Sequence, residues 1–287
     1  MNNIQFNNNI INLIKSRSSW RSYISKQLEE NELTAINILH TELTNGPLGS
    51  SARFQLINKT SALKIDNRRL GTYGFIKNPR YFIAGAVKRG EYHWEDYGYL
   101  MELIILKMTD MELGTCWLGG TFSRSAFGKI MQIRNDEVIP AVTSVGNISE
   151  TRSIRDHVIR WGAKSHSRKS INNLFFENNF NRPINLQTLD FYSDVLEMVR
   201  LAPSASNRQP WRIVKIYDNY HLFLKRSSKY ASYNNSIDLQ RVDMGIAMCH
   251  FELTANALGL KGYWKVNRPD LTPPDSIEYI VTWESIN

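Results

Sequence analysis

The sequence predicts an α+β fold in which one series of helices and strands occurs twice. Residues 100–113 carry apolar side chains around the whole helix circumference, which predicts a buried central helix, and residues 242–258 predict a second one. Continuous apolar runs such as residues 81–87 predict buried strands. The two helices superpose when the sequence is shifted by 147 residues, which indicates an internal duplication.

The first half contains a recognisable order of elements. Apolar spacing predicts a short helix at residues 10–14, an amphipathic helix at 30–43, strands at 54–57, 81–87 and 139–145, and the central helix between the last two strands. Asp96 lies before the central helix, and its short carboxylate predicts an N-terminal cap. Gly114 follows the helix and predicts a left-handed cap at its other end.

The second half repeats this order after a change in composition. Residues 152–169 are rich in arginine and lysine, and residues 172–185 are rich in asparagine and predict a linker. A helix at 189–200, strands at 213–217 and 222–225, the second central helix and a strand at 278–283 follow. We therefore expect a first half at residues 1–150, a linker at 151–187 and a second half at 188–287, with the two halves forming one globular unit.

The repeat is visible at individual positions. The shift of 147 residues pairs Asp96 with Asp243, Gly98 with Gly245, and Trp117 with Trp264. A period of this length is too long for a solenoid. It indicates a duplicated half-domain with loops of changed length.

Composition and charge exclude several classes of protein. The 35 Lys and Arg residues against 27 Asp and Glu give a net charge of +8, which suits a phosphorylated cofactor or an acidic surface. We expect no nucleic-acid partner, because the sequence has no zinc-finger spacing and no arginine-rich tail. Cys116 and Cys249 form no paired motif, and the six histidines are scattered, so we expect no metal. The first residues lack the pattern of a signal peptide, and no apolar run could span a membrane, so we expect a cytoplasmic protein with no membrane partner.

The stretch LAPSASNRQPWRIV, residues 201–214, carries the strongest functional signal. Pro203 ends the preceding helix, and Ser204, Ser206 and Asn207 are short polar side chains that tolerate turn geometry. Such a loop can present hydroxyls, an amide and backbone N–H groups to one planar polar ligand. An ordinary connection between a helix and a strand is the alternative.

A second signal is RSSWRSY, residues 17–23. Two arginines four residues apart, with serines between them, suit an anion at a helix terminus, because arginine offers forked donors and serine a hydroxyl. A solvated basic turn is the alternative. Glycine-rich segments at residues 71–75 and 114–120 permit close approach of the backbone to a ligand.

These motifs resemble those of the FMN-dependent nitroreductase family. PSASNRQPW is similar to the family pattern P-S-x-x-N-x-Q-P-W, whose loop lies against a flavin bound mainly by the other subunit of a dimer. RSSWRSY is similar to R-R-S-x-R-x-F, which holds the FMN phosphate and ribityl chain, although Ser16 stands where the first arginine is usual. The resemblance implies an α/β sandwich with mostly antiparallel sheets.

The resemblance also implies individual contacts with FMN. Residues 114–120 are similar to G-T-x-W-x-G-G, which runs past the flavin, so a backbone donor near Leu118, Gly119 or Gly120 is expected to face flavin N5. Arg168 stands where the family often has a basic residue that reaches the phosphate. The cofactor-binding residues implied are Arg17, Ser18, Arg21, Tyr73, Gly74, Thr115, Trp117, Leu118, Gly119, Gly120, Arg168, Pro203, Ser204, Ala205, Ser206 and Asn207.

Nitroreductases are homodimers, and a fusion of two halves could reproduce that dimer in one chain. RSSWR occurs only in the first half and PSASNRQPW only in the second. We therefore expect a monomer that acts as a pseudo-dimer with one composite site.

The resulting leading hypothesis is an FMN oxidoreductase. NAD(P)H would reduce the flavin, and the flavin would reduce a small-molecule acceptor such as a nitroaromatic or a quinone, with no catalytic side chain required. A flavin store or sensor without reductase turnover is the alternative, and a basic nucleic-acid binder is a third hypothesis.

Overall fold

Each half of the chain forms a five-stranded sheet beside one long helix. The computed structural model describes residues 4–61, 70, 76–148, 167–227 and 237–286. The first half contains α1 (Ile10–Ser16), α2 (Glu30–Glu42), β1 (Ala52–Asn58), β2 (Tyr81–Lys88), α4 (His93–Asp110), β3 (Gly114–Leu118), α5 (Arg124–Ile130), β4 (Glu137–Val138) and β5 (Val142–Gly146). The second contains η1 (Ile171–Asn173), β6 (Phe175–Glu177), η2 (Leu186–Thr188), α7 (Tyr192–Leu201), η3 (Ala205–Asn207), β7 (Trp211–Ile216), β8 (Asn219–Lys225), α9 (Leu239–Ala257), β9 (Lys261–Lys265) and β10 (Ile277–Ile286).

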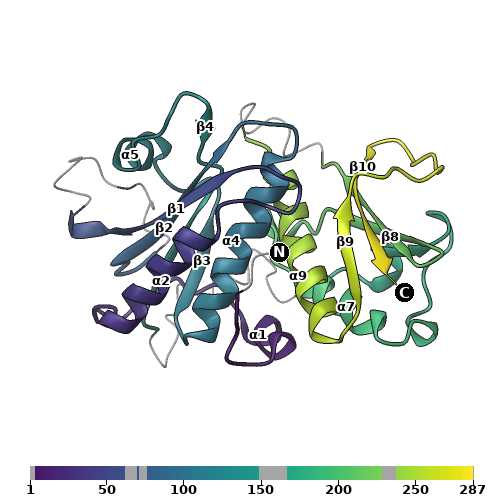
Figure 1. The fold of residues 1–287 in the computed structure, drawn as a ribbon, viewed down its shortest axis with the longest axis horizontal. Coiled ribbons are helices and arrows are strands. Elements are labelled where there is room, and N and C mark those ends of the chain that lie inside the picture. The colour runs from purple at the N-terminus through teal and green to yellow at the C-terminus, as the bar shows by residue number, and fades with distance from the viewer. Residues whose placement is uncertain (1–3, 62–69, 71–75, 149–166, 228–236, 287) are drawn as a thin grey trace.

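The two sheets share one strand order. In the first sheet the order is β1-β2-β5-β3, with β4 paired to β2, and every pairing is antiparallel. In the second sheet β7-β8-β10-β9 follow the same antiparallel order, and β6 adds a parallel edge to β7. Figure 1 shows α4 and α9 between the two sheets. The predicted α+β class with mostly antiparallel sheets and central helices is confirmed.

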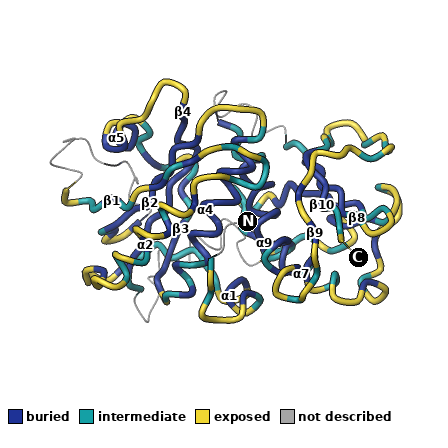
Figure 2. The backbone as a smooth tube through the Cα atoms, in the orientation of Figure 1, coloured by how far each residue is buried: buried dark blue, intermediate teal, exposed yellow. Residues whose placement is uncertain are grey.

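The two central helices pack against each other at a pair of glycines. A Cβ atom on Gly98 of α4 would overlap the backbone carbonyl of Val242 in α9. A Cβ atom on Gly245 of α9 would overlap the backbone carbonyl of Glu95 in α4. Figure 2 shows that both helices are buried along most of their length, as their continuous apolar character predicted. Glycine is needed at positions 98 and 245 because the backbones of α4 and α9 touch there and leave no room for a side chain.

Asp96 does not cap α4, contrary to the sequence prediction. The helix begins at His93 after Tyr92, and Asp96 lies inside the first turn. Its carboxylate accepts the backbone N–H groups of Leu48 (2.8 Å) and Ser50 (2.7 Å). Asp96 does bind free backbone N–H groups, as a capping residue would, but these belong to a loop that is distant in sequence.

The predicted cap at Gly114 is also wrong. Glu112 takes the left-handed conformation after the helix, with φ 59°, whereas Gly114 opens β3. A Cβ atom on Gly114 would overlap Ile148 and press on Trp20, so a glycine is needed there for close packing. The segment read as a glycine-rich connection is therefore mostly a strand, paired with β5.

Two other segments differ from the prediction. Part of the asparagine-rich stretch predicted as a linker forms β6, whose Phe175 is fully buried beside β7. The strand predicted at residues 139–145 begins later, at Val142 of β5, and Pro140 separates it from the short strand β4, which precedes the predicted range. Proline has no backbone N–H for a ladder, which accounts for the interruption.

The glycine contact predicts a large effect of one methyl group. Gly98→Ala should destabilise the protein by about 3 kcal/mol, because the added carbon meets backbone that cannot move without separating the helices. Gly90→Ala is the matched control, since a Cβ atom there meets nothing within 4 Å. Chemical denaturation of both variants measures the difference, and equal stabilities would contradict a close helix contact.

A buried ion pair between the halves predicts a dependence of stability on pH. Glu95 of α4 is fully buried and binds the Arg241 guanidinium of α9. Burial raises the pKa of Glu95 from 4.5 to about 7, and Arg241 only partly opposes this. Between these values the folded state binds more protons than the unfolded state, so this group's contribution to stability falls as the pH rises.

Glu95→Gln removes that titration and keeps an oxygen acceptor for Arg241. Relative to the wild type, the variant should therefore gain on the order of 3 kcal/mol between pH 4.5 and pH 8. Denaturation curves of both proteins at the two pH values test this. A constant difference in stability would show that Glu95 is ionised throughout the range.

Candidate functional site

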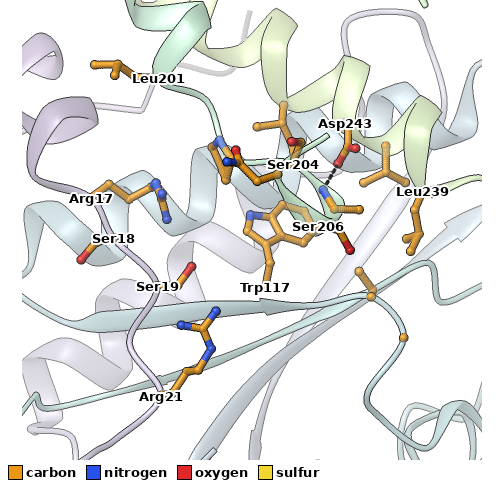
Figure 3. Close-up of a pocket in the computed structure, with 18 of the residues that line it drawn as sticks. Arg17, Ser18, Ser19, Arg21, Trp117, Leu201, Ser204, Ser206, Leu239 and Asp243 are labelled. Atoms are coloured by element: carbon orange, nitrogen blue, oxygen red, sulfur yellow. Dashed lines mark hydrogen bonds between the residues drawn. The ribbon is translucent and has the colours of Figure 1, made fainter. Parts of the chain in front are cut away.

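A cavity of about 610 Å³ lies where the two halves meet. Its wall is formed by the end of α1, the segment after β3, the loop after α7 and the first turns of α9 (Figure 3). This volume lies in the range of cofactor sites. The structure brings together most of the predicted contacts, namely Arg17, Ser18, Arg21, Trp117, Gly119, Gly120, Arg168, Pro203, Ser204, Ala205, Ser206 and Asn207.

Four predicted contacts are not among the residues that line this cavity. Thr115 and Leu118 are buried in β3, where they pair with β5. The Thr115 carbonyl accepts the Trp20 N–H (2.8 Å), so Thr115 supports the segment that carries Arg17 and Arg21. Tyr73 and Gly74 lie outside the described residues.

The arginine–serine segment leaves α1 in an extended conformation. Arg17 follows the last residue of the helix, with φ −53° and ψ 127°. Ser19 forms a parallel bridge with Thr115, and the Tyr23 hydroxyl donates to the Trp20 carbonyl (2.9 Å). The segment is therefore fixed along the edge of the first sheet. Figure 3 shows the Arg17 and Arg21 side chains on one side of the cavity.

A buried polar network lies behind that wall. The Trp117 indole N–H donates to Glu102 Oε2 (2.7 Å), and His250 Nε2 lies 3.0 Å from Glu102 Oε1. His250 Nδ1 donates to the Met198 carbonyl (2.9 Å), since a carbonyl oxygen can only accept. Arg17 Nε lies 3.8 Å from Glu102 Oε1. This network joins α4 to α9, fixes Trp117 at the cavity and places the Glu102 carboxyl group near Arg17.

The loop after α7 is held in an uncommon conformation. Ser206, Asn207 and Gln209 all have positive φ angles, of 49°, 53° and 47°. Such conformations cost free energy for residues other than glycine and persist where surrounding bonds determine them. The Gln209 N–H donates to Ser204 Oγ (2.9 Å), and its side-chain amide donates to the Asn207 carbonyl (3.2 Å). The loop is thus pre-formed.

Arg168 lies against this loop. Its guanidinium donates to the Leu201 carbonyl (3.0 Å) and to Asn207 Oδ1 (3.3 Å). The Asn207 amide donates in turn to the Ser167 carbonyl (2.9 Å). These hydrogen bonds hold the Arg168 guanidinium beside the loop, and Arg168 therefore also lines the cavity.

Sequence reasoning missed several lining residues, and Asp243 is the most informative of them. One of its carboxyl oxygens accepts the Ala205 N–H (2.9 Å), and burial raises its pKa well above the ordinary value. The repeat had already paired Asp243 with Asp96, which was a signal that could have found it. Leu239, Val242 and Ile246 of α9 add an apolar surface beside it.

The backbone after β3 is open toward the cavity. Arg124 donates to the Gly119 carbonyl (2.5 Å) and to the Pro140 carbonyl (3.0 Å), which fixes the turn. Leu239 packs so close to Gly119 that a Cβ atom there would come within 2.9 Å of it. A Cβ atom on Gly120 would meet nothing within 4 Å.

Charge is distributed unevenly around the cavity. Lys15, Arg17, Arg21 and Arg168 line it, and Asp243 is the carboxyl group among the described lining residues. Forked guanidinium donors suit a phosphate. Within the described residues there is no cluster of three or more His, Cys, Asp or Glu side chains that could hold a metal.

Solved structures show which fold this is. The chain is similar to a putative nitroreductase from Thermotoga maritima, with 20% identity, a TM-score of 0.61, and coverage of 98% of this chain and 95% of that one. It is also similar to a nitroreductase with bound FMN from Bacteroides fragilis (17% identity, TM-score 0.40, 51% of this chain and 92% of that one). An FMN-dependent nitroreductase from Clostridium difficile is another (16% identity, TM-score 0.39, 53% and 95%). The similarity to the Thermotoga maritima structure over almost the whole chain shows the nitroreductase fold.

The sequence identifies the family. Residues 9–255 match the family described as "Putative TM nitroreductase", and the chain belongs to it. The predicted resemblance is therefore confirmed, and the chain is an oxidoreductase of the nitroreductase kind. A comparison with curated proteins finds no match. In the part of the chain that the structure describes, no helix combines the length and apolar character needed to cross a membrane.

Proposed function

We propose that the chain binds FMN in the cavity between its halves and transfers electrons from NAD(P)H to a small-molecule acceptor. One observation carries the proposal. The arginine–serine segment of the first half and the Pro203–Asn207 loop of the second half line the same cavity, although they are far apart in sequence. These are the two motifs whose combination the family uses for its flavin.

The cations fit the phosphate of FMN. Arg17, Arg21 and Arg168 can donate forked hydrogen bonds, and Ser18 adds a hydroxyl. Arg168 is already held by hydrogen bonds to the loop, so little of its side-chain entropy is lost when a phosphate binds. FMN carries a single phosphate, and the sequence has no dinucleotide fingerprint that would favour FAD.

The remaining wall fits a planar ring. Trp117, the exposed backbone of Gly119 and Gly120, and the loop residues Ser204 and Ala205 line it. When bound, FMN supplies the redox chemistry, by taking a hydride from NAD(P)H and reducing an acceptor such as a nitroaromatic or a quinone. The protein holds and orients the ring, and the backbone at Gly119 and Gly120 is the proposed partner of flavin N5.

The purified protein should be yellow and should release FMN on denaturation. Chromatography identifies the flavin, and NADH or NADPH oxidation with a quinone or nitroaromatic acceptor measures turnover. FAD as the sole flavin would contradict the assignment of the cofactor. Bound FMN without any turnover would instead make the protein a flavin store or sensor.

We further propose that the chain is a duplicated half-domain that acts as a monomeric pseudo-dimer. The common strand order of the two sheets and the paired glycines Gly98 and Gly245 support this. The halves differ where a second flavin would bind. The loop at residues 46–50 is tied to Asp96, and the start of the second half has no counterpart of the arginine–serine segment.

This divergence predicts one FMN per chain rather than two. A phosphate at the opposite site would lack charge-assisted hydrogen bonds and would bind poorly. Titration of the apoprotein with FMN, followed by flavin fluorescence, gives the end point, and light scattering in the same buffer gives the number of chains per particle. An end point of two flavins per chain would contradict the proposed loss of the second site.

A further inference from the structure

Asp243 has one carboxyl oxygen that the protein itself does not use. The residue lies in the first turns of α9 and is 3% exposed. Its Oδ1 accepts the Ala205 N–H (2.9 Å), whereas Oδ2 is buried and has no hydrogen-bond partner among the described residues. Figure 3 shows Asp243 at the wall of the cavity, on the side away from Arg17 and Arg21.

The equivalent carboxyl group in the first half differs in this respect. Asp96 stands 147 residues earlier and uses both oxygens, which accept the N–H groups of Leu48 and Ser50. Both aspartates therefore hold the loop that follows the preceding helix. Only Asp243 leaves one oxygen without a partner among the described residues, and this aspartate lines the cavity together with the loop that it holds.

The surroundings of Asp243 favour a neutral carboxyl group. Burial raises the pKa of Asp243, the hydrogen bond from the Ala205 N–H partly opposes this, and Asp238 at the N-cap of α9 raises the pKa further. The neighbouring side chains on α9 that line the cavity, Leu239, Val242 and Ile246, are apolar. The cations Lys15, Arg17, Arg21 and Arg168 also line the cavity but are not among the charges that act on Asp243. Since Oδ1 accepts a hydrogen bond, the proton belongs on Oδ2.

We propose that Asp243 is a ligand-binding residue whose neutral carboxyl group donates a hydrogen bond from Oδ2 to the ring system of the ligand in the cavity. The acceptor is a carbonyl oxygen or an unprotonated ring nitrogen of a planar heteroaromatic ring. An anion is not the partner, because Arg17 and Arg21 lie on the other side of the cavity (Figure 3), and the α9 side chains that line it beside Asp243 are apolar. The inference rests on the proposed function. In it, Asp243 binds the flavin ring and the arginines bind the phosphate.

Two substitutions distinguish a hydrogen-bond donor at residue 243 from an ionised carboxylate. Asp243→Asn keeps an oxygen for the Ala205 N–H and an N–H donor for the ligand, so its Kd for FMN should stay within about threefold of the wild type. Asp243→Ala removes both and should weaken FMN binding by about tenfold or more, the effect of one buried hydrogen bond. Fluorescence titration with FMN measures both constants.

Asp96→Ala is the matched control for loop stability. It removes the same kind of loop contact in the other half, so it should lower the thermal stability of the apoprotein without changing the Kd for FMN. Equal FMN binding by Asp243→Ala and the wild type would overturn the proposal. It would also be overturned if Asp243→Asn bound as weakly as Asp243→Ala, because an ionised carboxylate would then be the group that matters.

An infrared measurement keeps the inference testable if Asp243→Ala does not fold. The apoprotein at pH 7 should show a protonated-carboxyl band that Asp243→Asn lacks, and the difference between the two spectra removes the other buried acids, Glu95, Asp96 and Glu252. The band should shift when FMN is added. Absence of the band contradicts a neutral Asp243 whether or not FMN binds, whereas failure of FMN to bind contradicts the proposed function alone.

Discussion

The structure depends on the contact between α4 and α9, where two glycines let the backbones of the central helices meet. Gly98 of α4 leaves room for the Val242 carbonyl of α9, and Gly245 of α9 leaves room for the Glu95 carbonyl of α4. The close crossing brings the start of α9 to the turn after β3, where Leu239 packs on Gly119. The cavity lies beside this contact, and its walls come from elements of both halves.

The two halves contribute different parts of the cavity wall. The first half supplies Lys15, Arg17, Arg21 and the turn at Gly119, and the second supplies the loop at residues 203–207 and the carboxyl group of Asp243. Buried hydrogen bonds connect the two contributions, because Glu102 of α4 binds both Trp117 at the cavity and His250 of α9. Removal of one partner from such a buried network leaves the other without its hydrogen bonds, which is costly in a low-dielectric interior. The polar groups behind the cavity therefore fix the relative position of the halves as well as the side chains of the site.

The sequence predicted the features that depend on local residue patterns, and it missed those that depend on contacts between distant segments. The central helices were predictable from apolar residues alone, and the two site segments from short motifs of arginine, serine, proline and asparagine. β3 was missed because its glycines suggest a turn, although Gly114 is there to make room for Ile148. Asp96 was assigned to its own helix because a sequence does not show that a distant loop offers two free N–H groups. Asp243 was visible only as a member of the repeat, since its unused oxygen becomes evident once burial and neighbours are known.

The central claim is that one flavin lies between the halves and touches both. A crystal structure of the protein loaded with FMN tests this most directly. We expect density for a single flavin in the cavity, with its phosphate beside Arg17 and Arg21 and its ring beside Ser204, Ala205 and Asp243. Density at the first-half loop of residues 46–50, or a flavin bound by residues of one half alone, would contradict the account.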